Sequence, residues 1–238
     1  MQPEFDHRAA PALLTSAALA VHDLASGKLG LEATLVRIAE LATRAVDGDL
    51  ASVTWARPGA PLATIATTDA LASNLDGAQY DAGRGPCIEA ATVGLAVLVD
   101  DLHDAATWPE LARAAGTHGV RSSISVPIAA DTVIGALNVY GRHPSQFDET
   151  SVEIATTFAS QAAVAGTLDA ARTTADEFAR AMQSRSEIEQ AKGIIMAATG
   201  CDPDTAFDTL VRQSQHENRK LREIAAELVA RQHGRIQS

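Results

Sequence analysis

The last part of the chain holds the residues whose chemistry best suits contact with phosphate. From Arg212 onward the chain contains three acidic residues and six basic ones, namely Arg212, Arg219, Lys220, Arg222, Arg231 and Arg235. Residues 1–171 hold 9 basic and 20 acidic residues and so carry the whole net charge of -11, while 172–238 hold 10 of each. Because phosphate contacts need Lys and Arg clustered on one surface, a nucleic-acid face is consistent with this pattern. Charge alone favours the alternative, a solvated helix with pairs such as Arg219 with Glu223.

The apolar spacing predicts that three short helices over residues 186–230 position these side chains. Gly200 ends the first helix, because glycine is common just past a helix. Asp202 followed by Pro203 starts the second, and Asn218 is the expected N-cap of the third. Such helices bury a small core but bring no acid, base and nucleophile together. We therefore expect this unit to bind rather than to catalyse.

Three sequence runs in this region carry a family resemblance. They are Arg185-x-x-Ile188-Glu189-Gln190-Ala191-Lys192-Gly193-Ile194-Ile195-Met196, Ala206-Phe207-x-x-Leu210-x-Arg212-x-Ser214 and Asn218-x-Lys220-Leu221-x-x-Ile224-Ala225. Together they closely resemble the ANTAR family, small RNA-binding domains of bacterial transcription antitermination regulators. The resemblance spans all three helices without a gap, and it implies RNA binding.

The candidate RNA-binding residues that follow from the resemblance are Lys192, Gly193, Arg212, Ser214, Asn218 and Lys220. Arginine can stack on a splayed base, and Ser and Asn can read base edges. Two of the residues have structural alternatives, Asn218 as a helix cap and Ser214 as a small core residue, so Arg212 and Lys220 are favoured over Asn218. Gly193 inside a helix costs about 1 kcal/mol relative to alanine. Close approach of RNA or tight packing against the third helix would explain it.

The region before these helices is long enough to bury a core of its own. Its periodicity predicts helices over residues 13–23 and 31–46, a hairpin of strands 51–57 and 62–67, and further strands over 96–99, 122–128 and 132–140, with a tight turn at Ala129 to Asp131. Helical pieces are expected over Pro86 to Thr92 and from Trp108 to Ala115. Helices at both ends of an antiparallel sheet predict an α+β fold.

Several motifs of this region resemble the GAF family of ligand-sensing or signal-sensing domains over about residues 30–165. They are Gly83-Arg84-Gly85-Pro86-Cys87, Asp100-Asp101-Leu102, Trp108-Pro109, Gly119-Val120-Arg121-Ser122 and a hairpin from Val126-Pro127-Ile128 to Gly135-Ala136-Leu137-Asn138-Val139-Tyr140. The resemblance implies a GAF-like antiparallel sheet with flanking helices and a small-molecule ligand of unknown identity. The acidic cluster of Asp100, Asp101, Asp104 and Glu110 with His103 is a solvated loop or the rim of a ligand pocket.

Cys87 is the candidate for covalent chemistry, since a thiol at a helix start can have a lowered pKa. A thiol reductase would need a resolving cysteine, and the only other one, Cys201, lies in the other predicted domain. A packed structural cysteine is therefore favoured. Two cysteines argue against a disulfide framework or zinc cluster, and seven scattered histidines show no metal-ligand spacing. We expect no catalytic residues, no metal and no cofactor.

A helical connector is expected between the two domains. Leu168, Ala171, Ala175, Phe178 and Met182 recur at three and four, the pattern of a two-helix seam. Self-association is favoured over packing on the chain's own sensor, because the stripe would otherwise be exposed. The predicted division is a flexible tail (1–12), a GAF-like sensor (13–165), a coiled-coil connector (166–185) and an ANTAR RNA-binding domain (186–238).

The first residues lack the charged and apolar pattern of a signal peptide, and no stretch reaches the ~18 apolar residues of a membrane span, so we expect a cytoplasmic protein without membrane contact. The resemblances together imply a signal-responsive regulator that promotes transcription antitermination by binding paired stem-loops in leader RNA as a homodimer. The alternatives are a sensor-domain regulator whose helical tail binds DNA or a protein partner, and an enzyme in the sensor domain.

Overall fold

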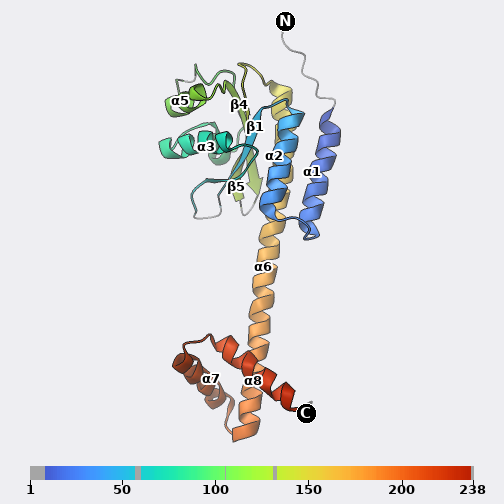
Figure 1. Ribbon diagram of the computed structural model, residues 1–238, viewed down its shortest axis with the longest axis vertical. Helices are drawn as coiled ribbons and strands as arrows, with labels where there is room; N and C mark the ends of the chain where they lie inside the picture. The colour runs from blue at the N-terminus through green and yellow to red at the C-terminus, as the bar shows by residue number, and fades with distance from the viewer. Residues whose placement is uncertain (1–8, 57–59, 105, 131–132, 237–238) are drawn as a thin grey trace. The chain divides into compact units, whose positions relative to one another are not determined.

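The computed structural model describes residues 9–56, 60–104, 106–130 and 133–236 of the chain (Figure 1). These residues form two compact units, which divide between Ala171 and Arg172. The first contains a sheet with helices on both faces, and the second is helical. Among the described residues, no helix combines the length and the apolar character that crossing a membrane requires.

The first unit is built on a five-stranded sheet with the order β2-β1-β5-β4-β3, in which all neighbouring strands are antiparallel. The strands are β1 (Leu50–Ala56), β2 (Ala63–Thr67), β3 (Val97–Val99), β4 (Ser122–Ala130) and β5 (Val133–Gly141). All five coincide with the segments predicted from β-branched residues and turn signals, which confirms the antiparallel α+β fold. The tight turn predicted at Ala129 to Asp131 is wrong at Ala129 and Ala130, which belong to β4 and pair with β5, and Asp131 lies outside the described residues.

Two layers of helices cover the sheet, as Figure 1 shows. The helices of this unit are α1 (Ala10–Ala25), α2 (Leu31–Ala45), α3 (Ala70–Ala82), α4 (Pro86–Val93), α5 (Pro109–Thr117) and the first turns of α6 (Glu149–Thr199). The larger core holds residues of α1, α2 and α6 on one face of the sheet. Smaller clusters on the other face hold residues of α3, α4 and α5.

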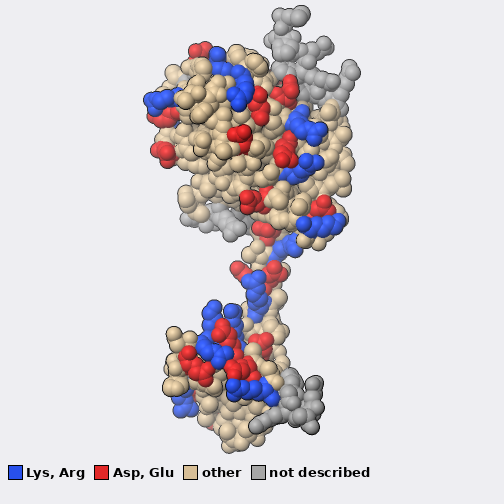
Figure 2. Space-filling model, viewed as in Figure 1, with Lys and Arg blue, Asp and Glu red and all other residues tan. Residues whose placement is uncertain are grey.

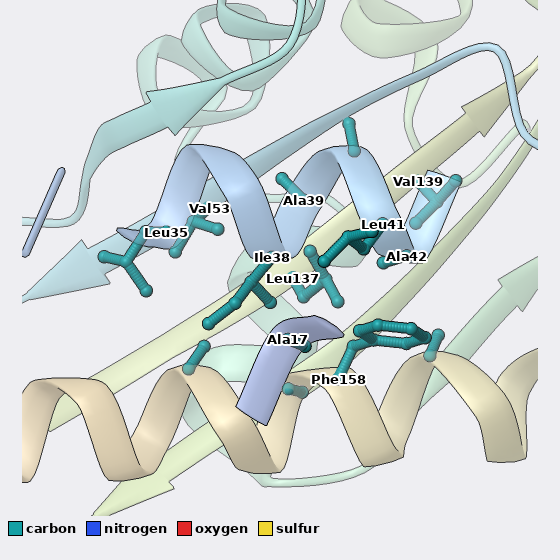
Figure 3. Packing of buried hydrophobic residues seen from close by; sticks show 14 of the residues in the cluster. Ala17, Leu35, Ile38, Ala39, Leu41, Ala42, Val53, Leu137, Val139 and Phe158 are labelled. Atoms are coloured by element: carbon teal, nitrogen blue, oxygen red, sulfur yellow. The ribbon is translucent and has the colours of Figure 1, made fainter. Parts of the chain in front are cut away.

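Strand alternation explains which residues enter the larger core. Successive side chains of a strand point to opposite faces, so Leu137 and Val139 of β5 face α2 while Asn138 and Tyr140 face α3. Figure 3 shows Ile38 of α2 and Phe158 of α6 directed toward the same group of aliphatic side chains. One face of the sheet and helices α1, α2 and α6 therefore enclose a single apolar core.

Helix α3 was not predicted from the sequence, unlike the other described elements of this unit. Its residues lack a clean apolar stripe and include Gly77, so periodicity does not identify it. The signals that were available are at its ends. Asp69 caps the start by accepting from the Leu71 amide at 2.7 Å, and Gly83 ends it in the left-handed conformation at φ 65°.

The second unit contains the last part of α6, α7 (Pro203–Glu217) and α8 (Leu221–Ile236). All three helices contribute buried residues to its core, namely Ala191 of α6, Leu210 of α7, and Ile224 and Ala225 of α8. The first of the three predicted helices is not a separate short helix. It is the end of α6, a single helix of 51 residues, because no proline or glycine interrupts the chain between Gly166 and Gly193.

The predicted role of Asn218 as N-cap of the third helix is wrong. Asn218 is the C-cap of α7, in the left-handed conformation at φ 51°, which asparagine tolerates better than most residues. Its amide donates to the Gln215 carbonyl at 3.3 Å. The carbonyl of Lys220 accepts the Glu223 amide at 2.9 Å, so Lys220 and not Asn218 precedes α8.

Candidate nucleic-acid interface and sensor interior

Three of the six predicted RNA-binding residues, Ser214, Asn218 and Lys220, lie at the end of α7 and the start of α8, and Arg212 lies earlier on α7. Ser214 is fixed in place, because its hydroxyl donates to the Arg219 carbonyl at 2.5 Å and its own carbonyl accepts the Arg219 amide at 3.0 Å. Ser214 and Asn218 therefore shape the turn. Ser214 is half-buried and is not the core residue that its structural alternative predicted, and Asn218 caps α7 instead of the third helix.

Arg219 has its charge neutralised within the unit. Its guanidinium lies 3.0 Å from Glu217 and 2.8 Å from Glu227. The hydrogen bond from Arg219 lowers the pKa of the Glu227 carboxyl. For Arg219 the solvated, ion-paired face is the correct interpretation of the basic pattern.

Arg212 and Lys220 differ from Arg219 in this respect. Both are exposed, and neither has an ion pair within the part of the chain that the structure describes. The Arg212 side chain donates only to the Asp208 carbonyl at 3.4 Å and to the Thr209 hydroxyl at 3.3 Å. Figure 2 shows Lys and Arg interspersed with Asp and Glu on the visible face of this unit. Unpaired cations on such a mixed face are the ones available to phosphate.

Lys192 and Gly193 lie on the last turns of α6. The Lys192 ammonium lies 3.0 Å from the Glu189 carboxylate, and its side chain is only 17% exposed. Gly193 is exposed, and a Cβ at this position would meet nothing within 4 Å. Tight packing against the third helix is therefore not the reason for this glycine. It borders a cleft of about 520 Å³ that also includes Ile194 and Val229.

The connector residues divide into two groups. Leu168 packs against the larger core of the first unit, whereas Phe178 and Met182 are 67% and 50% exposed. Ala171 and Ala175 are exposed as well. The seam predicted for self-association is thus open along the part of α6 that belongs to the second unit.

A buried polar cluster centred on Asp76 lies inside the first unit, and the sequence analysis did not identify it. The Asp76 carboxylate is fully buried and accepts from the Tyr140 and Thr64 hydroxyls, each at 2.7 Å, and from Asn138 Nδ2 at 3.3 Å. Desolvation raises the pKa of Asp76 above its ordinary 3.8, and the hydrogen bonds from its neighbours oppose that rise. The cluster joins α3 to β2 and β5.

Three buried polar atoms beside this cluster have no hydrogen-bond partner among the residues that the structure describes. They are Asn138 Oδ1, Ser123 Oγ and Ser125 Oγ. Ser125 lies opposite Asn138 and Ser123 lies opposite Tyr140 across the β4–β5 ladder. These side chains therefore point to the same face of the sheet, the one that contacts Asp76 of α3. A buried polar group without a partner costs about 1–3 kcal/mol, and such groups suit a ligand that supplies the missing hydrogen bonds. The residues of this region come from distant segments, which is why spacing did not reveal it.

Cys87 is fully buried at the start of α4. Its amide donates to Gln79 Oε1 at 2.9 Å, and burial raises the pKa of its thiol. The interpretation as a packed cysteine is confirmed. Among the described residues, no group of three or more His, Cys, Asp or Glu side chains is arranged to hold a metal ion.

Two carboxylates of the predicted acidic cluster, Asp101 and Glu110, form ion pairs with arginines. Arg121 donates to Asp101 through two nitrogens, with Nε at 2.9 Å, and this hydrogen bonding lowers the pKa of Asp101 to about 2. Arg84 pairs with Glu110 at 3.0 Å. These carboxylates are therefore part of surface ion pairs.

Comparisons with solved structures agree with the fold of the first unit. The GAF domain of a phosphoenolpyruvate-protein phosphotransferase from Coxiella burnetii aligns with a TM-score of 0.56 at 15% identity, covering 71% of this chain and 99% of that one. A free methionine-R-sulfoxide reductase from Neisseria meningitidis, solved with its substrate, aligns with a TM-score of 0.52 at 20% identity, covering 72% and 96%. Identities this low show the fold alone. Comparison with curated proteins gave no significant match.

Family models match both units. The GAF domain model matches residues 28–165, more than half of the chain, and the ANTAR domain model matches residues 176–229. ANTAR domains are RNA-binding domains of antitermination regulators, and GAF domains are sensor domains. The chain therefore belongs to the GAF domain family and has the GAF-ANTAR architecture, a sensor domain followed by an RNA-binding regulatory domain.

Proposed function

We propose that this protein is a signal-responsive regulator that promotes transcription antitermination by binding paired stem-loops in leader RNA as a homodimer. The observation that carries the proposal is the pair of exposed cations Arg212 and Lys220, which have no ion pair among the described residues of an ANTAR domain. The neighbouring Arg219 is neutralised by Glu217 and Glu227. Charge is thus left available at the two positions to which the family resemblance assigns RNA contacts.

The homodimer follows from the connector. Phe178 and Met182 expose large apolar side chains, with small Ala171 and Ala175 on the same stripe of α6. A second copy of this helix would cover the stripe, and the alanines would allow close approach. Two chains joined in this way present two ANTAR domains, one for each stem-loop of a pair. Binding then needs only to outweigh the competing terminator pairing, and no catalysis is required.

The signal is proposed to enter through the interior of the GAF domain. Asn138 Oδ1, Ser123 Oγ and Ser125 Oγ offer unused hydrogen-bonding groups to a small polar ligand. A ligand that prefers one arrangement of the sensor would shift the population of the dimer. The regulator role also accounts for Cys87, whose burial suits packing rather than turnover.

The experiment that tests this function measures binding of the purified protein to a two-hairpin leader RNA, a single-hairpin RNA and duplex DNA over a salt series. Lys220→Ala and Arg212→Ala are compared with Arg231→Ala, a matched control whose exposed guanidinium already pairs with Glu227. We expect tight binding that prefers the two-hairpin RNA, and a loss of about tenfold or more in the first two variants only. Binding of DNA alone, or of neither nucleic acid, would refute the antitermination function.

A further inference from the structure

A second basic site on the ANTAR unit includes none of the positions that the family resemblance indicated. A cleft of about 530 Å³ is lined by Ala179, Arg180, Gln183 and Ser184 of α6 and by Arg222 of α8. Two guanidinium groups from different helices thus line one cavity, together with a hydroxyl and a side-chain amide.

The electrostatics of this cleft are unbalanced. Neither Arg180 nor Arg222 makes an ion pair with any residue that the structure describes, and both are exposed. By contrast, Arg219 and Arg231 of the same unit are paired with carboxylates. Arg222 also lies in the first turn of α8, where the free amides of a helix start add partial positive charge. Two unpaired cations beside a helix start favour an anion between them.

We propose that this cleft binds a phosphodiester group of the RNA backbone, an inference that rests on the proposed RNA-binding function. A guanidinium presents a planar fork of donors that matches two phosphate oxygens, and arginine is preferred where such recognition is needed. Ser184 and Gln183 supply shorter-range donors on the same wall. The site fixes the position of the RNA rather than its sequence, because phosphate contacts carry no base information.

The location of Arg180 gives the site a particular meaning. At about 100° per residue, Arg180 lies on roughly the opposite side of α6 from the Phe178 and Met182 stripe. RNA bound in the cleft and a second chain packed on the stripe therefore do not compete for the same face. The RNA would contact α6 within the connector itself, so RNA binding would favour the helical state of that segment.

The test uses Arg180→Gln, Arg222→Gln and the double variant of the full chain, with Arg231→Gln as the matched control on α8. Binding of several stem-loop RNAs that differ only in loop sequence is measured across a salt series, with circular dichroism to verify folding. We expect each single variant to bind all RNAs about five- to tenfold more weakly. The slope of log Kd against log salt should fall by about 0.7–0.9 in the double variant, the value for one lost phosphate contact.

A second arm uses inorganic phosphate as the probe. Nε–Hε resonances of the arginines are followed by NMR during a phosphate titration and assigned by their loss in the two single variants. Shifts confined to Arg180 and Arg222 support the site, and shifts at Arg231 alone would overturn it. If the double variant binds RNA with wild-type affinity and slope, the cleft is not an RNA contact and the proposed function still stands. If the wild type binds no RNA, the proposed function fails, and with it the phosphodiester ligand, whatever the phosphate arm shows.

Discussion

The hydroxyl of Tyr140 donates a 2.7 Å hydrogen bond to the carboxylate of Asp76, and both side chains are essentially excluded from solvent. The bond joins β5 to α3 across 64 positions of the sequence. Gln79 Nε2 donates in turn to the Tyr140 hydroxyl at 3.1 Å, so one face of α3 is tied to the sheet by polar contacts. A buried carboxyl held only by neutral donors makes the stability of the sensor domain depend on pH.

Replacing Asp76 with asparagine should remove that dependence. Because the folded pKa of Asp76 is raised, its favourable contribution is fully present below the ordinary value of 3.8 and is lost as pH rises through the folded pKa. The wild type should therefore lose stability relative to Asp76→Asn as pH rises. Urea unfolding followed by tryptophan fluorescence at pH 5 and pH 8 measures this, since Trp55 and Trp108, the only tryptophans of the chain, both lie in the first unit.

The control for this prediction is Asp81→Asn, which removes an exposed carboxyl from the same helix. It should leave the pH dependence of the wild type unchanged. A parallel pH dependence in the wild type and in Asp76→Asn would contradict the assignment of the buried charge. Asp76→Ala, which removes the acceptor of the Tyr140 hydroxyl, should cost about 1–3 kcal/mol at pH 5 and less at pH 8, where the wild type has itself lost stability.

Gly166→Ala should destabilise the first unit. A Cβ at Gly166 of α6 would overlap the indole ring of Trp55 on β1, and neither the buried ring nor the helix has room to move. Overpacking of this kind costs about 1–3 kcal/mol and outweighs the helical preference of alanine. The free energy of unfolding, again from tryptophan fluorescence, checks this, and an unchanged or higher stability would show that the interior adapts.

Gly193→Ala, made in the same helix, should have the opposite effect on stability. No atom lies within 4 Å of the new methyl group, so the helix gains about 1 kcal/mol from the loss of glycine. If RNA approaches the α6 backbone at Gly193, the same variant should bind the stem-loop RNA more weakly. Thermal unfolding by circular dichroism and an RNA titration on one preparation separate the two effects, and undiminished RNA affinity would remove Gly193 from the interface.

Phe178→Glu and Met182→Glu should convert a dimer to monomers, because each places a charge on the exposed apolar stripe of α6. Molar mass from light scattering after size-exclusion chromatography is the measurement. Val93→Glu is the control, since Val93 is 66% exposed but lies on α4. A wild type that is monomeric at tens of micromolar, with and without RNA, would exclude the proposed homodimer.

Of the two thiols, only Cys201 should react rapidly with a chromogenic disulfide reagent in the native protein. Cys87 is fully buried and its thiol pKa is raised, so little thiolate forms and the reagent has no access. Both thiols should react in denaturant, and the Cys201→Ser variant should show no fast phase. A fast native phase in that variant would place Cys87 at an accessible site and reopen the thiol-reductase alternative.

The strands were predictable because their residues follow local rules. β1 and β5 are rich in β-branched and apolar residues and are bounded by turn residues, so the residue pattern and the turn signals predicted the same strands. Helix α3 was not, because half of its buried residues are polar, with Asp76 and Gln79 in the interior beside Ala72 and Leu75. A pattern that equates polar with exposed assigns such a helix to a loop.

The candidate sites divide along the same line. Family motifs indicated Arg212 and Lys220 as candidates, but they could not show that Arg219, which precedes Lys220 in the chain, is neutralised by Glu227, eight positions further on. Arg180 and Arg222 line one cleft only because α6 and α8 are brought together in the folded bundle. Asn218 illustrates a further limit, since the same residue type serves as N-cap or as left-handed C-cap and the sequence does not choose.

The middle of α6 is exposed, and this exposure lowers the stability of the helix in that segment. Residues 171–183 are all exposed, so this segment is not anchored in a packed core, and a helix of that length is marginal in water. In a single chain its amides should exchange with deuterium far sooner than those of the two ends, which are anchored in folded cores. A second chain on the Phe178 and Met182 stripe would slow that exchange, and hydrogen exchange along α6 would then record whether the connector is held as a helix or free to melt.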